Sequence, residues 1–331
     1  MRKIYVLLIF ISKFLFSQNE VCLEIEANPN LDDPAFQCFS KYVNVLDCFS
    51  IFAEPGVSDS KVLHVASVAA ELLDNDEDGV VDDNNIFNKL LNQQALMPIF
   101  TYDGNSCMDN FMDYYNGDGV SAALWRNEID PSQPGHWGAD ATVEEVLHTI
   151  NHVGHVSVYP SAFNIYPNSS IMSEAMDIAR GGQFLNVPNS YPNEAWYHYD
   201  DWTCDYECQA IEYLYWSIVT HMGILDDPQT CSGIYNEWEP CSPELFENTD
   251  ILMHSLITDI DYNLPLIAPD GNYCPSNTDG DLNFDGIINI LDVIIVVNLI
   301  LNIEYEDLAD INNDESIDVL DVILIVNIIL N

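Results

Sequence analysis

The residues best suited to chemistry are histidines, and four of the eight in this chain lie between His136 and His155. His148 and His152 are four residues apart, so on a helix they share one face and can bind one metal ion. Imidazole nitrogens are common zinc ligands. His155 follows on nearly the same stripe, and we expect it to be a hydrogen-bonded structural residue. The spacing therefore predicts a metal-binding helix over residues 142–157.

A hydrolytic metal site also needs a base that accepts a proton from the attacking water. Glu145 lies one turn before His148 on the same side of the expected helix, and we predict that it is the catalytic base, with Glu144 the next candidate. Two other roles stay open. Thr142 and Glu145 have the spacing of a capping box, in which Glu145 would bond to the backbone of Thr142. The helix could also supply three metal ligands by itself, from Glu145, His148 and His152.

This arrangement resembles the zinc peptidases of the His₂Glu type, the thermolysin-like enzymes, which add a third ligand from a following helix. The resemblance implies that His148, His152 and Glu174 bind zinc and that Asp177 accepts a hydrogen bond from a ligand histidine. The chain departs from the family at Thr149, because the family has its glutamate base directly after the first histidine. The implied activity is zinc-assisted hydrolysis of a peptide or related bond.

An acidic loop over residues 74–85 separates two expected helices, 62–73 and 86–94. In a 12-residue EF-hand loop, Ca²⁺ takes oxygens from positions 1, 3, 5, 7, 9 and 12, and glycine stands at position 6. Gly79 occupies position 6 here. The predicted calcium ligands are Asp74, Asp76, Asp78, the Val80 carbonyl, Asp82 and Asn85. A neutral residue at position 12 predicts a lower affinity than a bidentate glutamate would give.

The C-terminal segment contains one calcium-loop unit written twice, 29 residues apart, each followed by an apolar run. The predicted ligands of the first loop are Asp281, Asn283, Asp285, the Ile287 carbonyl, Asn289 and Asp292. Those of the second are Asp310, Asn312, Asp314, the Ser316 carbonyl, Asp318 and Asp321. Glu315 replaces the glycine of position 6, which predicts a weaker second site. With the acidic loop above, the chain has up to three predicted calcium sites.

The duplication, the aspartate at position 12 and the single helix after each loop resemble the type I dockerin module. The resemblance implies a fold that forms on Ca²⁺ and binds a cohesin domain of a scaffold, often in polysaccharide-degrading assemblies. Loop positions 10 and 11 help to choose the partner in that family. They are apolar pairs here, and they are the predicted partner-binding residues Ile290, Leu291, Val319 and Leu320.

Composition indicates an exported protein. Residues 1–18 have the basic start and apolar core of a signal peptide, and the nine cysteines then favour disulfides, with one left free or paired between chains. The net charge of −46, from 54 acidic and 8 basic residues, excludes nucleic acid as a partner, since binding phosphates needs Lys and Arg. The apolar runs are shorter than the roughly 20 residues of a membrane span. We expect a secreted protein that a scaffold can hold at the cell surface.

These patterns predict a mostly α fold, with α+β as the alternative. A helical zincin-like domain with disulfides would occupy residues 19–264, a linker 265–278 and a two-repeat dockerin-like domain 279–331. The expected function is a calcium-binding, zinc-dependent hydrolase of the peptidase type. One alternative is a non-catalytic, calcium-stabilised accessory component. Another is a carbohydrate-active enzyme or binding module, suggested by the aromatic-rich loop 191–202.

Overall fold

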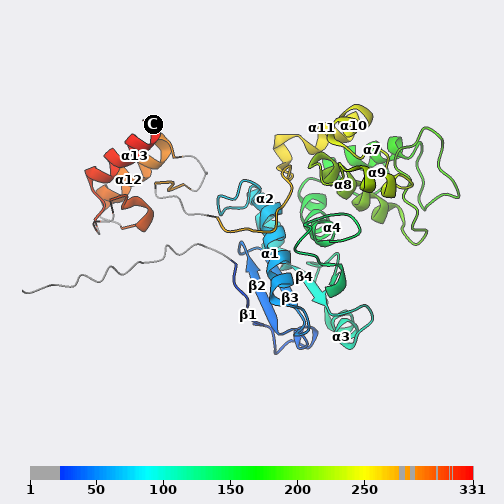
Figure 1. Cartoon of the computed structure of the whole chain (residues 1–331), viewed down its shortest axis with the longest axis horizontal. Coiled ribbons are helices and arrows are strands. Elements are labelled where there is room, and N and C mark those ends of the chain that lie inside the picture. Colours follow the sequence, from blue (N-terminus) through cyan, green and yellow to red (C-terminus); the bar gives the residue numbers. More distant parts are fainter. Residues whose placement is uncertain are drawn as a thin grey trace, which may run out of the picture.

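The computed structural model describes residues 23–275, 280–283, 288–302, 305–312, 314 and 316–330. The fold is mixed α+β, with one five-stranded sheet that α1 (Asp59–Leu73), α2 (Asn84–Gln93) and α4 (Thr142–Thr149) contact and further helices that lie away from it (Figure 1). The sequence predicted a mostly α fold and gave α+β as the alternative. The alternative is the class observed, and the sheet was not predicted. The predicted signal peptide lies outside the described residues.

The sheet follows the strand order β1-β2-β3-β4-β5. Its strands are β1 (Glu26–Ala27), β2 (Lys41–Val45), β3 (Phe49–Ala53), β4 (Ala95–Phe100) and β5 (Leu124–Trp125). The first three strands pair antiparallel, whereas β3, β4 and β5 pair parallel. A parallel pair needs a crossover connection, and the β3–β4 crossover contains both expected helices and the acidic loop between them.

We call residues 23–263 the main body. Its α-helices, α1 to α11, include α4, which carries the predicted metal ligand His148. They are α1 (Asp59–Leu73), α2 (Asn84–Gln93), α3 (Ser106–Tyr114), α4 (Thr142–Thr149), α5 (Val156–Val158), α6 (Pro160–Phe163), α7 (Ile171–Ala179), α8 (Tyr206–His221), α9 (Pro228–Ile234), α10 (Pro243–Thr249) and α11 (Ile251–Ile257). Short 3-10 helices are η1 (Pro34–Phe36), η2 (Arg126–Glu128) and η4 (Ile260–Tyr262). The expected helix 142–157 is interrupted by a π-helix, η3 (Ile150–His155).

Two apolar clusters lie on opposite sides of the sheet. Phe49, Ile51 and Ala53 of β3 belong to the main core with α1, whereas Phe52 belongs to an aromatic cluster with η1 and α3. This alternation is what a strand with both faces buried requires. Figure 1 shows the sheet and α1 at one end of the main body and α7 to α11 gathered at the other.

Three disulfides join described residues, as the cysteine content predicted. They are Cys38–Cys107, Cys204–Cys208 and Cys231–Cys241. Cys48 is a free, buried thiol. Disulfides are typical of proteins in oxidising, extracellular surroundings. Over the described part of the chain, no helix has the length and apolar character needed to cross a membrane.

The C-terminal repeats form α12 (Ile290–Asn302), the 3-10 helix η5 (Asp307–Ala309) and α13 (Val319–Leu330). The two α-helices pack on each other around a small core of their own that includes Val293, Val296 and Ile325. Their apolar runs are therefore explained in part by this packing.

The described part of the predicted linker is held against the main body. We call residues 264–275 the strap. The Asn75 side chain accepts the backbone N–H groups of Leu266 and Ile267, each at 2.9 Å. The Glu71 carboxylate likewise accepts the N–H groups of Gly271 and Asn272, each at 3.0 Å. The strap thus follows the end of α1 and the start of the acidic loop.

Candidate metal centre

The start of α4 is fixed to α1 by a buried carboxylate. Asp140 accepts a hydrogen bond from the Thr142 hydroxyl at 2.7 Å and lies 3.0 Å from Nε2 of His64 on α1. Ala141 is the N-cap and makes no side-chain cap bond. The predicted capping box between Thr142 and Glu145 therefore does not form, which leaves the Glu145 carboxylate for another contact.

That contact is with His148. Oε2 of Glu145 lies 3.6 Å from Nδ1 of His148, and Oε2 of Glu212 on α8 lies 3.4 Å from Nε2. The ligand-type atoms of Glu144, Glu145 and His148 all lie within 4.8 Å of one another. His148 is 8% exposed, so the imidazole is buried between two carboxylates. We call Glu144, Glu145, His148 and Glu212 the carboxylate–imidazole cluster.

The electrostatics of this cluster are those of a crowded acidic site. Burial raises the pKa of Glu144 to about 8, and although His148 opposes this, Glu212 and Glu145 raise it further. Burial alone would lower the pKa of His148, but Glu212 and Glu145 outweigh it and raise that pKa well above its ordinary range. A divalent cation would offset the repulsion among the carboxylates.

Two tyrosines complete the surroundings of the cluster. The Tyr215 ring lies edge-on to His148, with ring centres 5.7 Å apart. Burial and then the carboxylates of Glu144 and Glu212 raise the pKa of Tyr215, and burial and then Glu212 raise that of Tyr199. Both phenols therefore stay protonated and can donate to the carboxylates.

A cavity of about 210 Å³ opens beside the cluster. It is lined by Ser121, His148, His152, Ile165, Glu207, Cys208, Ile211 and Glu212. His148 and His152 therefore reach the same cavity, although the wider turn of η3 changes the spacing of a regular helix between them. Gly154 of η3 sits against α2, where an added Cβ would lie 3.3 Å from Ile86.

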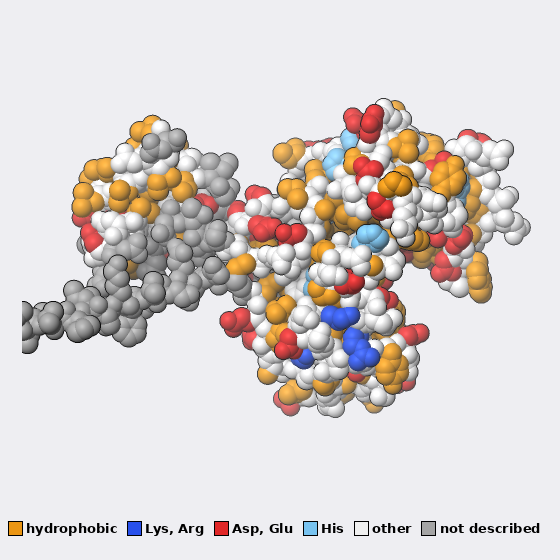
Figure 2. All heavy atoms as spheres, in the orientation of Figure 1, with side chains coloured by type: hydrophobic (Ala, Val, Ile, Leu, Met, Phe, Trp, Pro, Cys, Tyr) orange, Lys and Arg blue, Asp and Glu red, His pale blue; other side chains and the backbone are white. Residues whose placement is uncertain are grey.

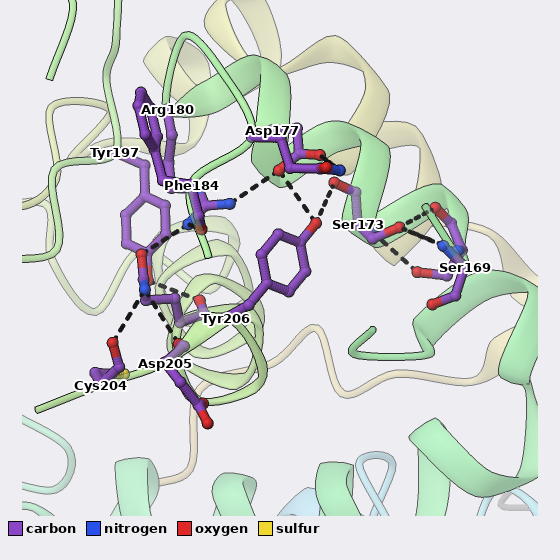
Figure 3. Close-up of polar contacts among 12 residues, drawn as sticks. Ser169, Ser173, Asp177, Arg180, Phe184, Tyr197, Cys204, Asp205 and Tyr206 are labelled. Atoms are coloured by element: carbon purple, nitrogen blue, oxygen red, sulfur yellow. Dashed lines mark hydrogen bonds and ion pairs between the residues drawn. The ribbon is translucent and has the colours of Figure 1, made fainter. Parts of the chain in front are cut away.

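The structure places Glu174 and Asp177 elsewhere. Glu174 is exposed on α7 and does not line the cavity. Asp177 accepts hydrogen bonds from Arg180 at 2.8 Å, Gln183 at 2.8 Å and Tyr206 at 3.1 Å (Figure 3). Among the described contacts, none joins either acid to His148 or His152. Asp177 instead belongs to a network that holds the buried Arg180.

Two acids that were not predicted from the sequence, Glu207 and Glu212, reach the cavity from α8. A signal was present, because Glu212 interrupts the apolar and aromatic run from Ala210 to Val219. A carboxylate on a buried helix costs free energy unless it is paired or binds a metal. Its distance in sequence from His148 gave no way to connect the two.

One residue of the acidic loop has the backbone conformation expected at its position in an EF-hand loop. Gly79 has φ +94°, the left-handed conformation for which glycine is used at position 6. Ligand-type atoms of Asp74, Asp76 and Asp82 lie within 4.8 Å of one another. Burial, and then the other acids of the loop, raise the pKa values of Asp78 and Asp82 to about 6 against the lowering effect of backbone N–H groups.

Most predicted ligands of this loop are exposed, including Asp76 and Asp82. Val80 is 49% exposed, and Asn85 is exposed in the first turn of α2, where Asp83 is the N-cap. The N-cap carboxylate accepts the N–H groups of Asn85 at 2.7 Å and Ile86 at 3.3 Å.

The position-12 aspartates of the C-terminal repeats, Asp292 and Asp321, are both fully buried. Asp292 accepts backbone N–H groups from Leu282 at 2.9 Å and Asn289 at 2.8 Å. Asp321 accepts that of Asp318 at 2.8 Å. Asp281 and Asp310 are also buried, and Asn283, Asn312, Asp314 and Ser316 lie in the loops. The predicted ligands Asp285 and Ile287 lie outside the described residues.

No family model, curated protein or solved structure matches the chain. The function is therefore argued from the geometry of these sites.

Proposed function

We propose that this chain is an exported, metal-dependent hydrolase that acts on a peptide or a related bond. The observation that carries the proposal is the buried imidazole of His148 between Glu145 at 3.6 Å and Glu212 at 3.4 Å. Partly buried carboxylates around one imidazole repel one another unless a cation offsets their charge, and carboxylate and imidazole are zinc ligand types. Zinc would polarise a carbonyl and lower the pKa of a bound water.

The roles follow from which side chains reach the cavity. His148 and Glu212 are the proposed ligands, and His152 reaches the same cavity from η3. Glu212 takes the role that the sequence assigned to Glu174, because Glu212 lines the cavity and Glu174 does not. Glu145 does not line the cavity, but it remains the proposed proton acceptor, since its carboxylate lies 3.6 Å from Nδ1 of His148 and is not used as a cap.

Substitutions separate these roles. His148→Ala and Glu212→Gln should lose bound zinc, measured by metal analysis of the purified chain. Glu145→Gln should keep zinc and lose about 10²-fold or more in the rate of peptide hydrolysis. Glu174→Gln is the matched control and should change neither quantity. If the wild-type chain binds Ca²⁺ but no zinc, the hydrolase proposal fails and the non-catalytic accessory role replaces it.

The C-terminal repeats are proposed to be a calcium-dependent docking module of the dockerin type that binds a cohesin domain. The supporting observation is the exposure of the four partner-binding positions, at 63% for Ile290, 52% for Leu291, 65% for Val319 and 54% for Leu320. Figure 2 shows hydrophobic side chains gathered over this part of the molecule. An apolar surface of this kind is typical of an interaction site.

Binding to a purified type I cohesin domain tests the docking proposal. Binding in Ca²⁺ should be lost with EDTA and weakened in a double variant Leu291→Asp, Leu320→Asp. Single substitutions should have a smaller effect if the two repeats bind interchangeably. Binding that survives both EDTA and the double variant would reject this role.

One observation favours carbohydrate binding as a second candidate function. A hollow of about 650 Å³ is lined by Tyr191, His198, Asp200, Trp202 and Asn236 among others. Trp202 is 83% exposed, and an exposed aromatic face beside polar groups can stack on a sugar ring. Trp202→Ala should reduce retention in affinity gels that contain soluble polysaccharides. Equal migration of the two proteins in every gel would reject it.

A further inference from the structure

The cavity beside the carboxylate–imidazole cluster contains an acid that the proposed metal chemistry does not use. α8 supplies Glu207, Cys208, Ile211 and Glu212 to the cavity wall. These residues follow the spacing i, i+1, i+4 and i+5, so they form one face of the helix. Glu212 is a proposed metal ligand, and Glu207 lies five residues earlier, about 7.5 Å along the helix axis. The Glu207 carboxylate is therefore left to contact what enters the cavity beside the metal.

The first turn of α8 fixes the position of Glu207. Asp205 is the N-cap of α8, and its side chain accepts the N–H of Cys208 at 3.1 Å. The Cys204–Cys208 disulfide closes the same turn. Figure 3 shows Cys204 and Asp205 at this end of the helix. The backbone on both sides of Glu207 is thus held in place, as a preorganised recognition group requires.

The charge of the cavity wall favours a cationic ligand. Among the described residues that line the cavity, two are glutamates and none is Lys or Arg. None of the ion pairs in the described part of the chain joins Glu207 to a basic side chain. The buried side chains of Ile165 and Ile211 add apolar surface to the wall. A cleft with one sign of charge and low-dielectric walls concentrates ions of the opposite sign.

The cavity also leaves a buried polar atom unsatisfied. His148 lines the cavity and is 8% exposed, and its Nε2 makes no hydrogen bond within the described residues. A buried polar atom without a partner is costly, so a ligand would complete this site. The cavity volume of about 210 Å³ is below the roughly 300–1,000 Å³ that is usual for drug-sized ligands. The space therefore suits a single residue of a substrate.

We propose, on the basis of the hydrolase function above, that Glu207 accepts a cationic group of the substrate through a charge-assisted hydrogen bond. The preferred substrate is a peptide with a free α-amine or a basic side chain next to the cleaved bond. The cation takes no part in the bond changes. Water adds to the carbonyl carbon, the C–N bond breaks, and the leaving amine takes up a proton. Glu207 is thus a specificity-determining residue.

Peptides that differ only beside the cleaved bond test this role. One has a free α-amine, one is acetylated and has a lysine, and one is acetylated and uncharged. Glu207→Gln should lower kcat/KM for the cationic peptides about 10- to 100-fold and leave the uncharged peptide within about twofold. The cationic peptide that loses more identifies the source of the charge. Glu247→Gln removes an exposed acid of α10 and is the matched control, which should change none of the three values.

Glu207 also lies where a carboxylate stabilises a helix through its dipole, and charge reversal separates that structural role from recognition. Glu207→Lys should shift the preference toward a peptide with a glutamate beside the cleaved bond, and Glu207→Asp should keep the preference for a cation. Circular dichroism checks that each variant folds. An equal loss of activity on all three peptides in folded Glu207→Gln would mean that the residue only supports α8, and it would overturn the proposal.

A binding measurement separates this inference from the hydrolase proposal. The chain in Ca²⁺ without zinc is titrated with alaninamide, N-acetyl-lysinamide and N-acetyl-alaninamide, and each Kd is measured by ligand-observed NMR. At least one of the two cations should bind about tenfold or more tightly than the neutral amide, and Glu207→Gln should remove the difference. This comparison within the wild-type chain remains decisive if a variant does not fold.

The two proposals fail in different ways. Selective binding of a cation through Glu207, without hydrolysis of any peptide by the zinc-loaded chain, would support the cation site and reject the hydrolase proposal. Hydrolysis of cationic and uncharged peptides at equal rates, with no preference in binding, would overturn the cation site and leave the hydrolase proposal in place.

Discussion

At the scale of single residues, His155 should dominate one part of the pH dependence of stability. It is 2% exposed and packs edge-on against Phe163 with ring centres 5.9 Å apart. Burial lowers its pKa from 6.5 to about 4. Between these values the unfolded chain binds more protons than the folded chain. The contribution of His155 is therefore fully present above pH 6.5 and falls by up to about 3 kcal/mol as the pH drops to about 4.

Urea unfolding of the wild-type chain and of His155→Leu, from neutral pH down to about pH 4, measures this effect. Other buried acids contribute to both curves, so the difference between the proteins isolates His155. The wild-type chain should lose stability more steeply than the variant as the pH falls. Parallel curves would mean that the folded protein already accommodates a charged imidazole at this position.

Cys48 should not react with thiol reagents in the folded protein. It is free and 4% exposed, and burial, assisted by Asp47, raises its pKa to about 12. The thiolate is the reactive form, so both access and ionisation oppose reaction. A thiol reagent at mildly alkaline pH should label this position only after unfolding in denaturant. Mass spectrometry locates the label, Cys48→Ala is the control, and rapid labelling under native conditions would contradict the prediction.

Spacing predicted those contacts of the candidate site that are local in sequence. Glu145 and His148 are three residues apart, so one helical turn brings them together. Glu212 comes from another helix, and its approach to His148 depends on how α4 and α8 pack. Glu174 also stands at a plausible spacing, but α7 leaves it exposed. Sequence alone could not choose between Glu174 and Glu212, because both are acids on a later helix.

At the scale of elements, α7 holds the buried Arg180 through Asp177, whereas the sequence predicted that Asp177 orients a zinc ligand. The two roles can be tested against each other. Arg180 is fully buried and donates to Asp177 at 2.8 Å and to Gln209 of α8 at 2.7 Å. Asp177→Asn should lower the free energy of unfolding by about 2 kcal/mol, since it removes a charge-assisted partner of a buried cation. It should leave zinc content unchanged. Loss of zinc without loss of stability would restore the role that the sequence gave to Asp177.

Elements with strong helical periodicity were predicted well, and the sheet was not. The expected helices at 62–73 and 86–94 correspond to α1 and α2. The β2–β3 hairpin turns through Leu46 and Asp47, at φ +48° and +57°, and has none of the glycine that usually marks such a turn. The π-helix η3, which packs against α2, was also not predicted from the sequence.

At the scale of the whole molecule, the charge leads us to expect that bound cations stabilise the fold. The chain carries a net charge of −46. On the face drawn in Figure 2, Lys and Arg gather in one small area while Asp and Glu are spread widely. Self-repulsion of this kind opposes a compact state, and bound Ca²⁺ would reduce it at the loops where carboxylates converge.

Removal of calcium should therefore loosen the main body and the C-terminal repeats together. The acidic loop joins α1 to α2, which support α4 and η3, and Asp74 accepts a hydrogen bond from Tyr273 of the strap. An emptied loop would restore repulsion among its carboxylates and weaken the hold on the strap. EDTA should lower every thermal transition, and hydrogen exchange at residues 264–275 should become faster. Asp76→Asn with Asp82→Asn should reproduce the effect on the main body in Ca²⁺ while leaving the C-terminal transition in place. If EDTA instead shifts only the C-terminal transition, the acidic loop does not bind structural calcium, and α1 and α2 are stable without it.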